Sequence, residues 1–188
     1  IKLFKGNFPG VFSVEHILLK NNVKIIEVKN INSKESLQYL SALNLDIIFS
    51  IAASQIFKKD ILNIPKIGCF NIHTSKLPKN RGMMPNFWSL YNFESDSSSA
   101  VTIHKMNETL DDGEILLQKV FDLDPMETLD SLIRRTKKLS VIAFLEAIEI
   151  LRTGSINYIV NNPKYASYNT FPTKDDVTRF KAKGYRLR

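Results

Sequence analysis

The polar side chains best placed to do chemistry follow one predicted strand. Asn71 and His73 stand two positions apart near the end of residues 67–73, and Thr74 and Ser75 come directly after them. Residues i and i+2 of a strand point to the same face, so an amide and an imidazole are aimed at one spot. An amide N–H can stabilise an oxyanion, and an imidazole can move a proton near neutral pH. The pair predicts a site that stabilises an oxyanion and moves a proton or, with equal weight, hydrogen bonds that only satisfy the end of a strand.

The second polar cluster is the stretch L-D-D-G-E at residues 110–114. An Asp-x-Gly sequence is typical of a tight loop with the glycine at positive φ, and this structural interpretation needs no function. In the functional interpretation, one of the carboxylates reaches His73, orients its ring and stabilises the imidazolium. Sequence separation does not decide between the two, because only the fold can bring the carboxylate and the imidazole together.

The elements expected to hold the first cluster alternate between strands and helices. We expect strands at residues 23–28, 46–53 and 67–73, with helices at 13–20, from the N-cap Ser33 to about residue 43, and at 58–62. The apolar run at 46–53 is nearly continuous, which is typical of a strand buried on both faces of a parallel sheet. This order predicts an α/β fold with a doubly wound, mostly parallel, Rossmann-like sheet.

The second half of the chain predicts a different arrangement. We expect a helix at 85–93, strands at 100–106 and 114–121, and a long helix at 128–152. The two strands are close enough in sequence to form a late antiparallel hairpin. An apolar stripe along the long helix is expected to face the core, and Gly154 stands where a C-terminal cap belongs.

The start of the chain does not resemble the start of a doubly wound domain. Residues 1–12 mix polar and apolar types and are interrupted by Gly6, Pro9 and Gly10, where such a domain normally opens with a buried strand. We therefore expect a sheet that lacks its opening strand. The predicted domains are an N-terminally incomplete catalytic domain at residues 1–154 and a short C-terminal extension at 155–188, packed on the body.

Composition excludes several classes of protein. The 188 residues are 44% hydrophobic and 24% charged, which excludes disorder, collagen and coiled coil. No apolar run approaches the length of a membrane span, and the only cysteine, Cys69, excludes a disulfide framework and a multi-cysteine metal site. We expect a cytoplasmic protein that binds no metal.

The net charge is positive and concentrated near the C-terminus. The chain carries 26 Lys and Arg against 19 Asp and Glu, a formal charge of +7, and six of the basic residues lie within 174–188. A basic surface favours anionic ligands such as nucleotides, folates, phosphates or RNA. Residues 174–188 lack the aromatic platform of RNA-binding modules, so we interpret them as a solvated tail and expect no nucleic-acid partner.

Two stretches together resemble the formyltransferase family that uses 10-formyltetrahydrofolate. They are I-G-C-F-N-I-H-T-S-K-L-P-K-N-R-G at residues 67–82 and V-T-I-H-K-M-N-E-T-L-D-D-G-E-I-L at 101–116. The family signature is N-I-H-x-S-x-L-P-x-x-R-G followed by L-D-x-G. The resemblance implies that Asn71 and His73 act with Asp111, the aspartate two positions before the glycine.

The resemblance also implies where the formyl donor, 10-formyltetrahydrofolate, binds. In the family the pterin lies between the loop after the strand at 46–53 and the loop before the catalytic aspartate. Here these loops are Ala53, Ser54, Gln55 and Ile56, and Asn107, Glu108, Thr109 and Leu110.

Ser75 and Arg81 are expected to contact the acceptor substrate. The planar guanidinium of Arg81 suits an anionic group, and the helix expected from Pro85 would add its N-terminus. The alternative is that Arg81 braces the preceding turn through backbone carbonyls.

The implied activity is transfer of a formyl group from 10-formyltetrahydrofolate to a primary amine. Asn71 and a protonated His73 would stabilise the tetrahedral oxyanion, and Asp111 would orient His73. Residues 81–92 and the Tyr- and Pro-containing tail resemble the sugar-nucleotide N-formyltransferases, so the predicted partner is a small-molecule amine, in particular a nucleotide-linked amino sugar.

Several alternatives to this activity stay open. They are a formyltetrahydrofolate hydrolase, a methionyl-tRNA formyltransferase-like enzyme and a truncated, non-catalytic binding module. A membrane partner is not expected, and a homodimer is an option that the sequence leaves undecided.

Overall fold

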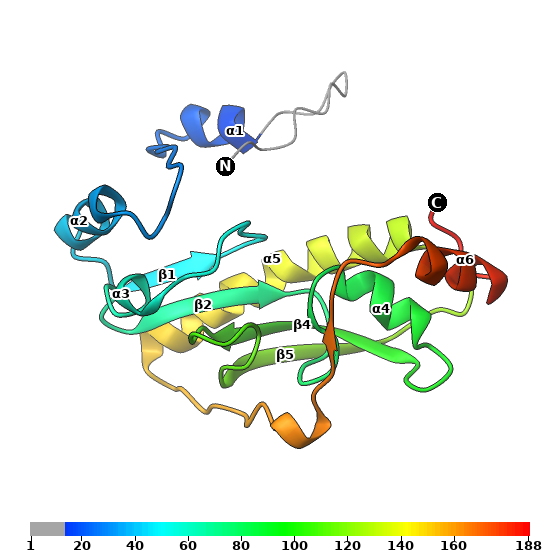
Figure 1. Cartoon of the computed structure of the whole chain (residues 1–188). Coiled ribbons are helices and arrows are strands. Elements are labelled where there is room, and N and C mark those ends of the chain that lie inside the picture. Colours follow the sequence, from blue (N-terminus) through cyan, green and yellow to red (C-terminus); the bar gives the residue numbers. More distant parts are fainter. Residues whose placement is uncertain (1–13) are drawn as a thin grey trace.

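A four-stranded sheet forms the centre of the computed structural model, which describes residues 14–188 (Figure 1). Its strands lie in the order β1–β2–β4–β5. Their bounds are Ile47–Ser50 for β1, Gly68–His73 for β2, Ser98–Lys105 for β4 and Ile115–Asp122 for β5. The α/β class and the late hairpin are confirmed. The parallel part is smaller than the sequence indicated, because β1 and β2 run parallel whereas β2–β4 and β4–β5 are antiparallel.

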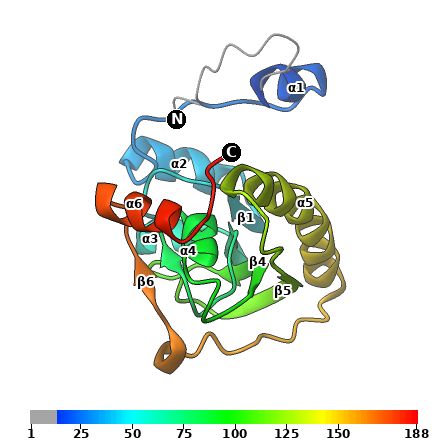
Figure 2. The ribbon, with the colours of Figure 1, turned by 90° about the vertical axis from the view of Figure 1, so that its right-hand side faces the viewer.

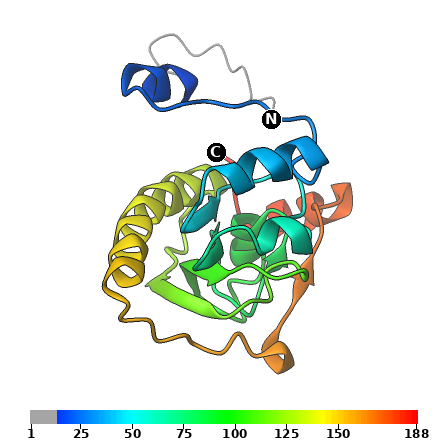
Figure 3. The ribbon, with the colours of Figure 1, turned by 90° about the vertical axis from the view of Figure 1, so that its left-hand side faces the viewer.

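Helices cover both faces of this sheet (Figures 2 and 3). Their bounds are Val14–Lys20 for α1, Lys34–Ala42 for α2, Lys59–Leu62 for α3, Pro85–Tyr91 for α4, Leu129–Thr153 for α5 and Lys174–Ala182 for α6. α5 packs on the face that carries Phe70 and Ile72, and α3 packs on the opposite face beside Cys69. No helix within residues 14–188 is both long enough and apolar enough to cross a membrane.

Local capping explains where α5 begins and ends. Thr128 and Ser131 form a reciprocal capping box at its start, and Gly154 adopts φ 71° at its end, a backbone conformation that favours glycine. Between these caps the predicted apolar stripe is buried; Ala143, Ala147 and Leu151 belong to the core under the sheet. Small residues at two of these positions let the helix approach the strands closely.

The prediction of a strand at residues 23–28 is wrong. This segment forms no strand, and Ile25 and Ile26 are 41% and 43% exposed. A β-branched run becomes a strand only where a neighbouring strand supplies hydrogen bonds and packing, and no described strand pairs with this one. The expectation about the opening strand concerns residues 1–12 and lies outside the described residues.

The tail after Gly154 lies against the body at several points. Ile159 exchanges two backbone hydrogen bonds with Ile115 of β5, at 2.8 and 2.9 Å. After the short 3-10 helix η1 (Pro163–Tyr165), strand β6 (Tyr168–Asn169) pairs in parallel with β3 (Arg81–Gly82). α6 then lies beside α4 (Figure 2), where Phe180 is fully buried. The domain boundary at residue 154 stays a prediction.

Candidate active site

Four polar side chains share one face of β2 and β4. Asn71 pairs with His104 and His73 pairs with Thr102 in the antiparallel register, so all four project to the side of the sheet opposite α5. Both imidazoles are almost completely buried. The expectation that Asn71 and His73 point to one spot is therefore met, and His104, which sequence reasoning did not place there, joins them through the strand register.

The carboxylate of Asp111 lies at the centre of this group. Its Oδ2 lies 3.5 Å from Nδ1 of His73 and accepts a 2.9 Å hydrogen bond from the backbone N–H of Gly82. Its Oδ1 lies 3.3 Å from Nε2 of His104 and accepts a 3.3 Å hydrogen bond from Nδ2 of Asn71. The fold thus brings together Asn71, His73 and Asp111, although Asn71 and Asp111 are 40 positions apart in the sequence.

The loop that carries Asp111 differs from the predicted tight turn. The positive φ falls on Asp111, at 53°, and not on Gly113. Gly113 is required for another reason, because a Cβ at this position would overlap the backbone carbonyl of Lys105. The carboxamide of Asn161, from the tail, donates to the carbonyl oxygens of Asp111 and Gly113 at 2.9 and 3.0 Å.

Each histidine of the site has one ring nitrogen committed to a carbonyl. His73 Nε2 lies 3.0 Å from the carbonyl of Asn80, and His104 Nδ1 lies 3.0 Å from that of Lys105. A carbonyl oxygen only accepts, so these two nitrogens carry hydrogen. In a neutral His73 the other nitrogen, Nδ1, which faces Asp111, carries none. The site can therefore take up a proton next to a carboxylate.

Burial and charge set the resting protonation of this cluster. Burial lowers the pKa of His73, against the opposing effect of the Asp111 charge. Burial alone would raise the pKa of Asp111, but the hydrogen bond with His104, the charge of His73 and the Gly82 N–H together lower it to about 2. At neutral pH we therefore assign an ionised Asp111 and a neutral resting His73. The protonated His73 that is expected to stabilise the oxyanion during the reaction stays a prediction.

Ser75 is not available to a substrate in this structure. It is fully buried, its hydroxyl lies 3.0 Å from that of Ser89, and it accepts a hydrogen bond from Asn80 Nδ2 at 3.2 Å. Ser75 follows the catalytic pair closely in the sequence, but its side chain is buried against Ser89 of α4. In this structure its hydroxyl holds Asn80, and its contact with the acceptor stays a prediction.

Arg81 is also turned inward. It is 7% exposed, it pairs through Nη1 with Asp112, and its Nη2 donates to the side-chain and backbone oxygens of Asn161 at 2.8 and 3.2 Å. A phosphate would have to displace these partners. The geometry favours the alternative, a structural role for Arg81. The segments that Arg81 holds are the tail and the Asp111 loop, and not the preceding turn that was expected.

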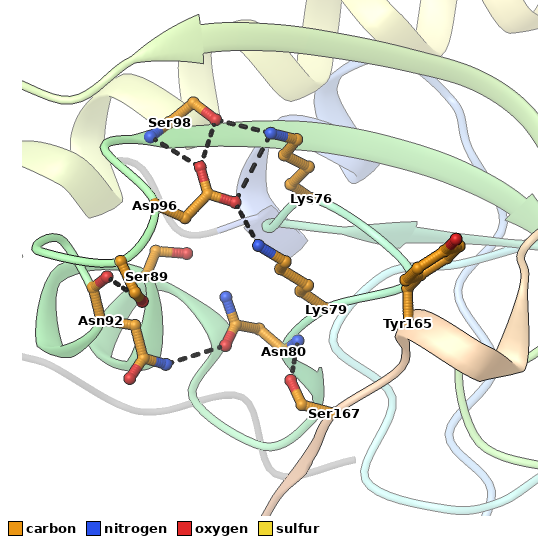
Figure 4. A pocket seen from close by; sticks show the side chains of 10 residues that line it. Lys76, Lys79, Asn80, Ser89, Asn92, Asp96, Ser98, Tyr165 and Ser167 are labelled. Carbon is orange, nitrogen blue, oxygen red and sulfur yellow. Dashed lines mark hydrogen bonds and ion pairs between the residues drawn. The ribbon is translucent and has the colours of Figure 1, made fainter.

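Asn80 connects His73 to a cavity of about 220 Å³ (Figure 4). Its backbone carbonyl accepts from His73, and its side chain lines the cavity. The lining residues are Lys76, Lys79, Asn80, Ser89, Asn92, Ser95, Asp96, Ser98, Tyr165 and Ser167. Asp96 lies between the two lysines, 3.5 Å from Lys76 Nζ and 2.9 Å from Lys79 Nζ. The cavity wall thus carries two lysine side chains and one carboxylate, a net charge of one positive.

The two loops predicted to hold the pterin are exposed. Ile56 in the first loop is 64% exposed and Leu110 in the second is 37% exposed, so each loop offers an apolar side chain to a flat ring. Gln55 is engaged elsewhere, since its amide bonds to backbone atoms of Lys29 and Ile31. The donor site formed by residues 53–56 and 107–110 stays a prediction.

Within residues 14–188, no group of three or more His, Cys, Asp or Glu side chains is arranged to hold a metal ion. The contacts around Asp111 offer proton transfer and hydrogen bonding.

Sequence comparison relates this chain to known proteins. A family model described as "Formyl transferase" matches residues 11–148. Methionyl-tRNA formyltransferase of Thermotoga maritima is 37% identical over 173 residues, which are 92% of this chain and 55% of that protein. The bifunctional polymyxin resistance protein ArnA of Wigglesworthia glossinidia brevipalpis is 36% identical over 83% of this chain and 24% of that protein. The chain spans about half the length of the methionyl-tRNA formyltransferases that it matches.

Two solved structures of similar fold are described with a nucleotide or a nucleotide-linked sugar, and with a folate. The formyltransferase PseJ from Anoxybacillus kamchatkensis, in complex with UDP-4,6-dideoxy-4-formamido-L-AltNAc and tetrahydrofolate, has a TM-score of 0.68 and 30% identity, covering 87% of this chain and 82% of that one. WlaRD, a sugar 3N-formyl transferase in the presence of dTDP and 5-N-formyl-THF, has a TM-score of 0.66 and 25% identity, covering 85% and 53%.

Proposed function

Because the chain belongs to the formyl transferase family, we propose that it moves a formyl group from 10-formyltetrahydrofolate to a primary amine. The observation that carries this proposal is the buried Asp111 carboxylate in contact with Asn71, His73 and His104. Formyl transfer needs a donor for a developing oxyanion and a group that accepts a proton and gives it back. This cluster contains both.

Asn71 is the proposed donor to the oxyanion. Its side chain is half-buried, whereas His73 and Asp111 are buried, so it is the member of the three most open to a substrate. In the free protein its Nδ2 group donates to Asp111 Oδ1 at 3.3 Å, which is a long hydrogen bond. The same Nδ2 group lies 3.4 Å from Nε2 of His104. An N–H of the amide therefore turns to the oxygen that gains charge, when the amine attacks, by releasing one of these two long contacts.

His73 is the proposed carrier of the proton. As the attacking amine forms its bond to the formyl carbon, it loses a proton, which Nδ1 of the neutral His73 takes up. The Asp111 carboxylate at 3.5 Å stabilises the resulting imidazolium, and the Asn80 carbonyl holds the ring through Nε2. When the bond between formyl carbon and folate nitrogen breaks, the proton passes from His73 to the departing nitrogen, and the site returns to its resting state.

The donor supplies an activated formyl carbon and a nitrogen leaving group. We assign its pterin to the loops at residues 53–56 and 107–110, because their exposed Ile56 and Leu110 fit the faces of a flat ring. Leu110 directly precedes Asp111 in the sequence, so a pterin ring in contact with Leu110 would lie beside the loop that carries Asp111.

For the acceptor we propose a nucleotide-linked amino sugar. The structures that resemble this chain include PseJ, described with a UDP-linked formamido sugar, and WlaRD, described with dTDP. A second candidate is the amine of methionyl-tRNA, favoured by the 37% identity with the Thermotoga enzyme. Arg81 stays a predicted acceptor contact, and an anionic group would have to displace Asp112 and Asn161 to reach it.

The test is product identity with two acceptors and a blank. The protein is incubated with 10-formyltetrahydrofolate and either a UDP- or dTDP-linked amino sugar, methionyl-tRNA, or no amine, and products are identified by mass spectrometry. Formylated sugar is the expected result. Formylated methionyl-tRNA alone would select the second candidate, and formate released equally with and without amine would identify a hydrolase and overturn the proposal.

A further inference from the structure

Asn161 is a buried polar side chain that the tail delivers to the catalytic loop. It is 5% exposed, and its Nδ2 donates to the backbone carbonyls of Asp111 and Gly113, on either side of Asp112. We propose that Asn161 is a positioning residue for Asp111, so that the segment after α5 completes the active site. This inference rests on the proposed function, because it takes Asp111 as the carboxylate of the reaction.

The contact with Arg81 fixes which way the carboxamide points. Arg81 Nη2 donates to Asn161 Oδ1 at 2.8 Å, and a guanidinium has no acceptor. The oxygen of the amide must therefore face Arg81, and the NH₂ group must face the two carbonyls. Arg81 in turn pairs with Asp112, so a single closed network joins the tail to both aspartates of the loop.

Asp111 needs such support because of its backbone. Its φ of 53° lies in the left-handed region, which non-glycine residues rarely adopt. The two hydrogen bonds from Asn161 fix the peptide planes that follow Asp111 and Gly113, and Gly82 N–H holds the side chain at Oδ2. A strained backbone conformation persists only where the surrounding contacts hold it. Asn161 supplies two of these contacts, its hydrogen bonds from the tail to the loop.

The path of the tail holds Asn161 in place. Ile159, two residues earlier, exchanges two backbone hydrogen bonds with Ile115 of β5, and Ser167 and Asn169 accept bonds from the backbone of Arg81 and Met83. The segment between these anchors has little freedom. Asn161 therefore reaches the loop as a pre-positioned group, which is what an effect on geometry requires.

The decisive variant is Asn161→Asp, with Asn162→Asp as the matched control. The first substitution would keep the shape of the side chain and the acceptor toward Arg81, but it would turn the NH₂ donor into an oxygen facing two carbonyls. Asn162 is exposed, and its side chain accepts a hydrogen bond from Lys164 N–H, which an aspartate also accepts. The two variants carry the same charge change one residue apart.

We expect Asn161→Asp to lower kcat by about 10- to 100-fold per folded molecule, the range for a misplaced catalytic group. The KM of each substrate should change by less than about threefold, because the residue contacts neither substrate in this scheme. Asn162→Asp should behave like the wild type. A merely structural Asn161 would lower the melting temperature but leave kcat per folded molecule unchanged, and that result would overturn the inference.

Asp111→Asn in the same assay separates this inference from the proposed function. If Asp111→Asn keeps wild-type kcat, the proposed catalytic role of Asp111 fails. If Asp111→Asn is inactive and Asn161→Asp keeps wild-type kcat, only the positioning role fails. Should Asn161→Asp not fold, Asn161→Ala, assayed below its melting temperature, gives the same decision, since it also lacks the donor.

Discussion

Two aspartates of this molecule have a pKa of about 2, and they reach it in different surroundings. Asp111 is 5% exposed and faces the imidazoles of His73 and His104. Asp96 is 19% exposed and faces the ammonium groups of Lys76 and Lys79 at the wall of a cavity. In both, burial raises the pKa, and hydrogen bonds and nearby charges together outweigh it. For Asp96 the first of these is the hydrogen bond from the Ser98 hydroxyl, followed by the one from Lys79.

The difference lies in whether the neighbours can change charge. Lysine, the residue type beside Asp96, has an ordinary pKa far above the neutral range. An imidazole has an ordinary pKa of about 6.5 and gains or loses a proton near neutral pH. Only at Asp111 can the charge beside the carboxylate follow a proton transfer. The same carboxylate chemistry therefore shapes a cavity in one region and suits catalysis in the other.

Neutralising each aspartate in turn gives the largest expected contrast. Asp111→Asn removes the charge that stabilises imidazolium at His73, and we expect kcat to fall by roughly 10²- to 10⁴-fold, the range for loss of acid–base catalysis. Asp96→Asn leaves the imidazoles untouched, and we expect kcat within about threefold of the wild type. Initial rates of formylated product measure both. Equal losses in the two variants would break the comparison.

The next prediction concerns stability and the network that Arg81 forms with Asp112 and Asn161, beside Asp111. Arg81→Ala leaves Asp112 and Asn161 without their buried partner, a loss on the order of 3 kcal/mol in the free energy of unfolding. For a chain of this length we expect the melting temperature to fall by roughly 6–12 °C. Calorimetry measures it. An unchanged melting temperature with a raised KM for the acceptor alone would restore Arg81 as a substrate contact.

Part of this site could be predicted from local sequence. Asn71 and His73 share a face because a strand has a period of two, and the caps Ser33 and Gly154 stand where the structure has them. The placement of Asp111 beside His73 came from the family resemblance, because no local rule relates residues 38 positions apart along the chain (111 − 73).

The remainder depends on contacts between distant segments. His104 joins the site through the register of β2 against β4, and Asn161 reaches it through the path of the tail. Arg81 carries a charge that suggests a ligand, but Asp112 and Asn161 are brought to it by the fold. Residues 23–28 show the converse, because strand propensity without a partner strand gives no strand.

The pH dependence of stability should report the buried His73. Its pKa is lowered in the folded state, so the unfolded chain binds the extra proton first as pH falls. The contribution of the neutral imidazole is fully present above the ordinary pKa of 6.5 and is lost as pH falls below it. We expect His73→Gln to flatten the decrease of the melting temperature below pH 6.5. An unchanged slope would show that folding does not shift the pKa of His73, and a steeper slope would show that folding raises it.

The smallest expected effect is at the lysines of the cavity. Lys79 is 51% exposed, and its pair with Asp96 is screened by solvent, so Lys79→Met should lower the free energy of unfolding by only about 0.2–1 kcal/mol. Lys76 and the Ser98 hydroxyl remain on Asp96, so its pKa should stay below the ordinary 3.8. Thermal unfolding at low and high salt measures this, and the difference from wild type should shrink as salt rises. A large, salt-independent loss of stability, or a loss of kcat comparable to that of Asp111→Asn, would mean that Asp96 is coupled to the imidazole cluster through Asn80, and the two regions would no longer be separate.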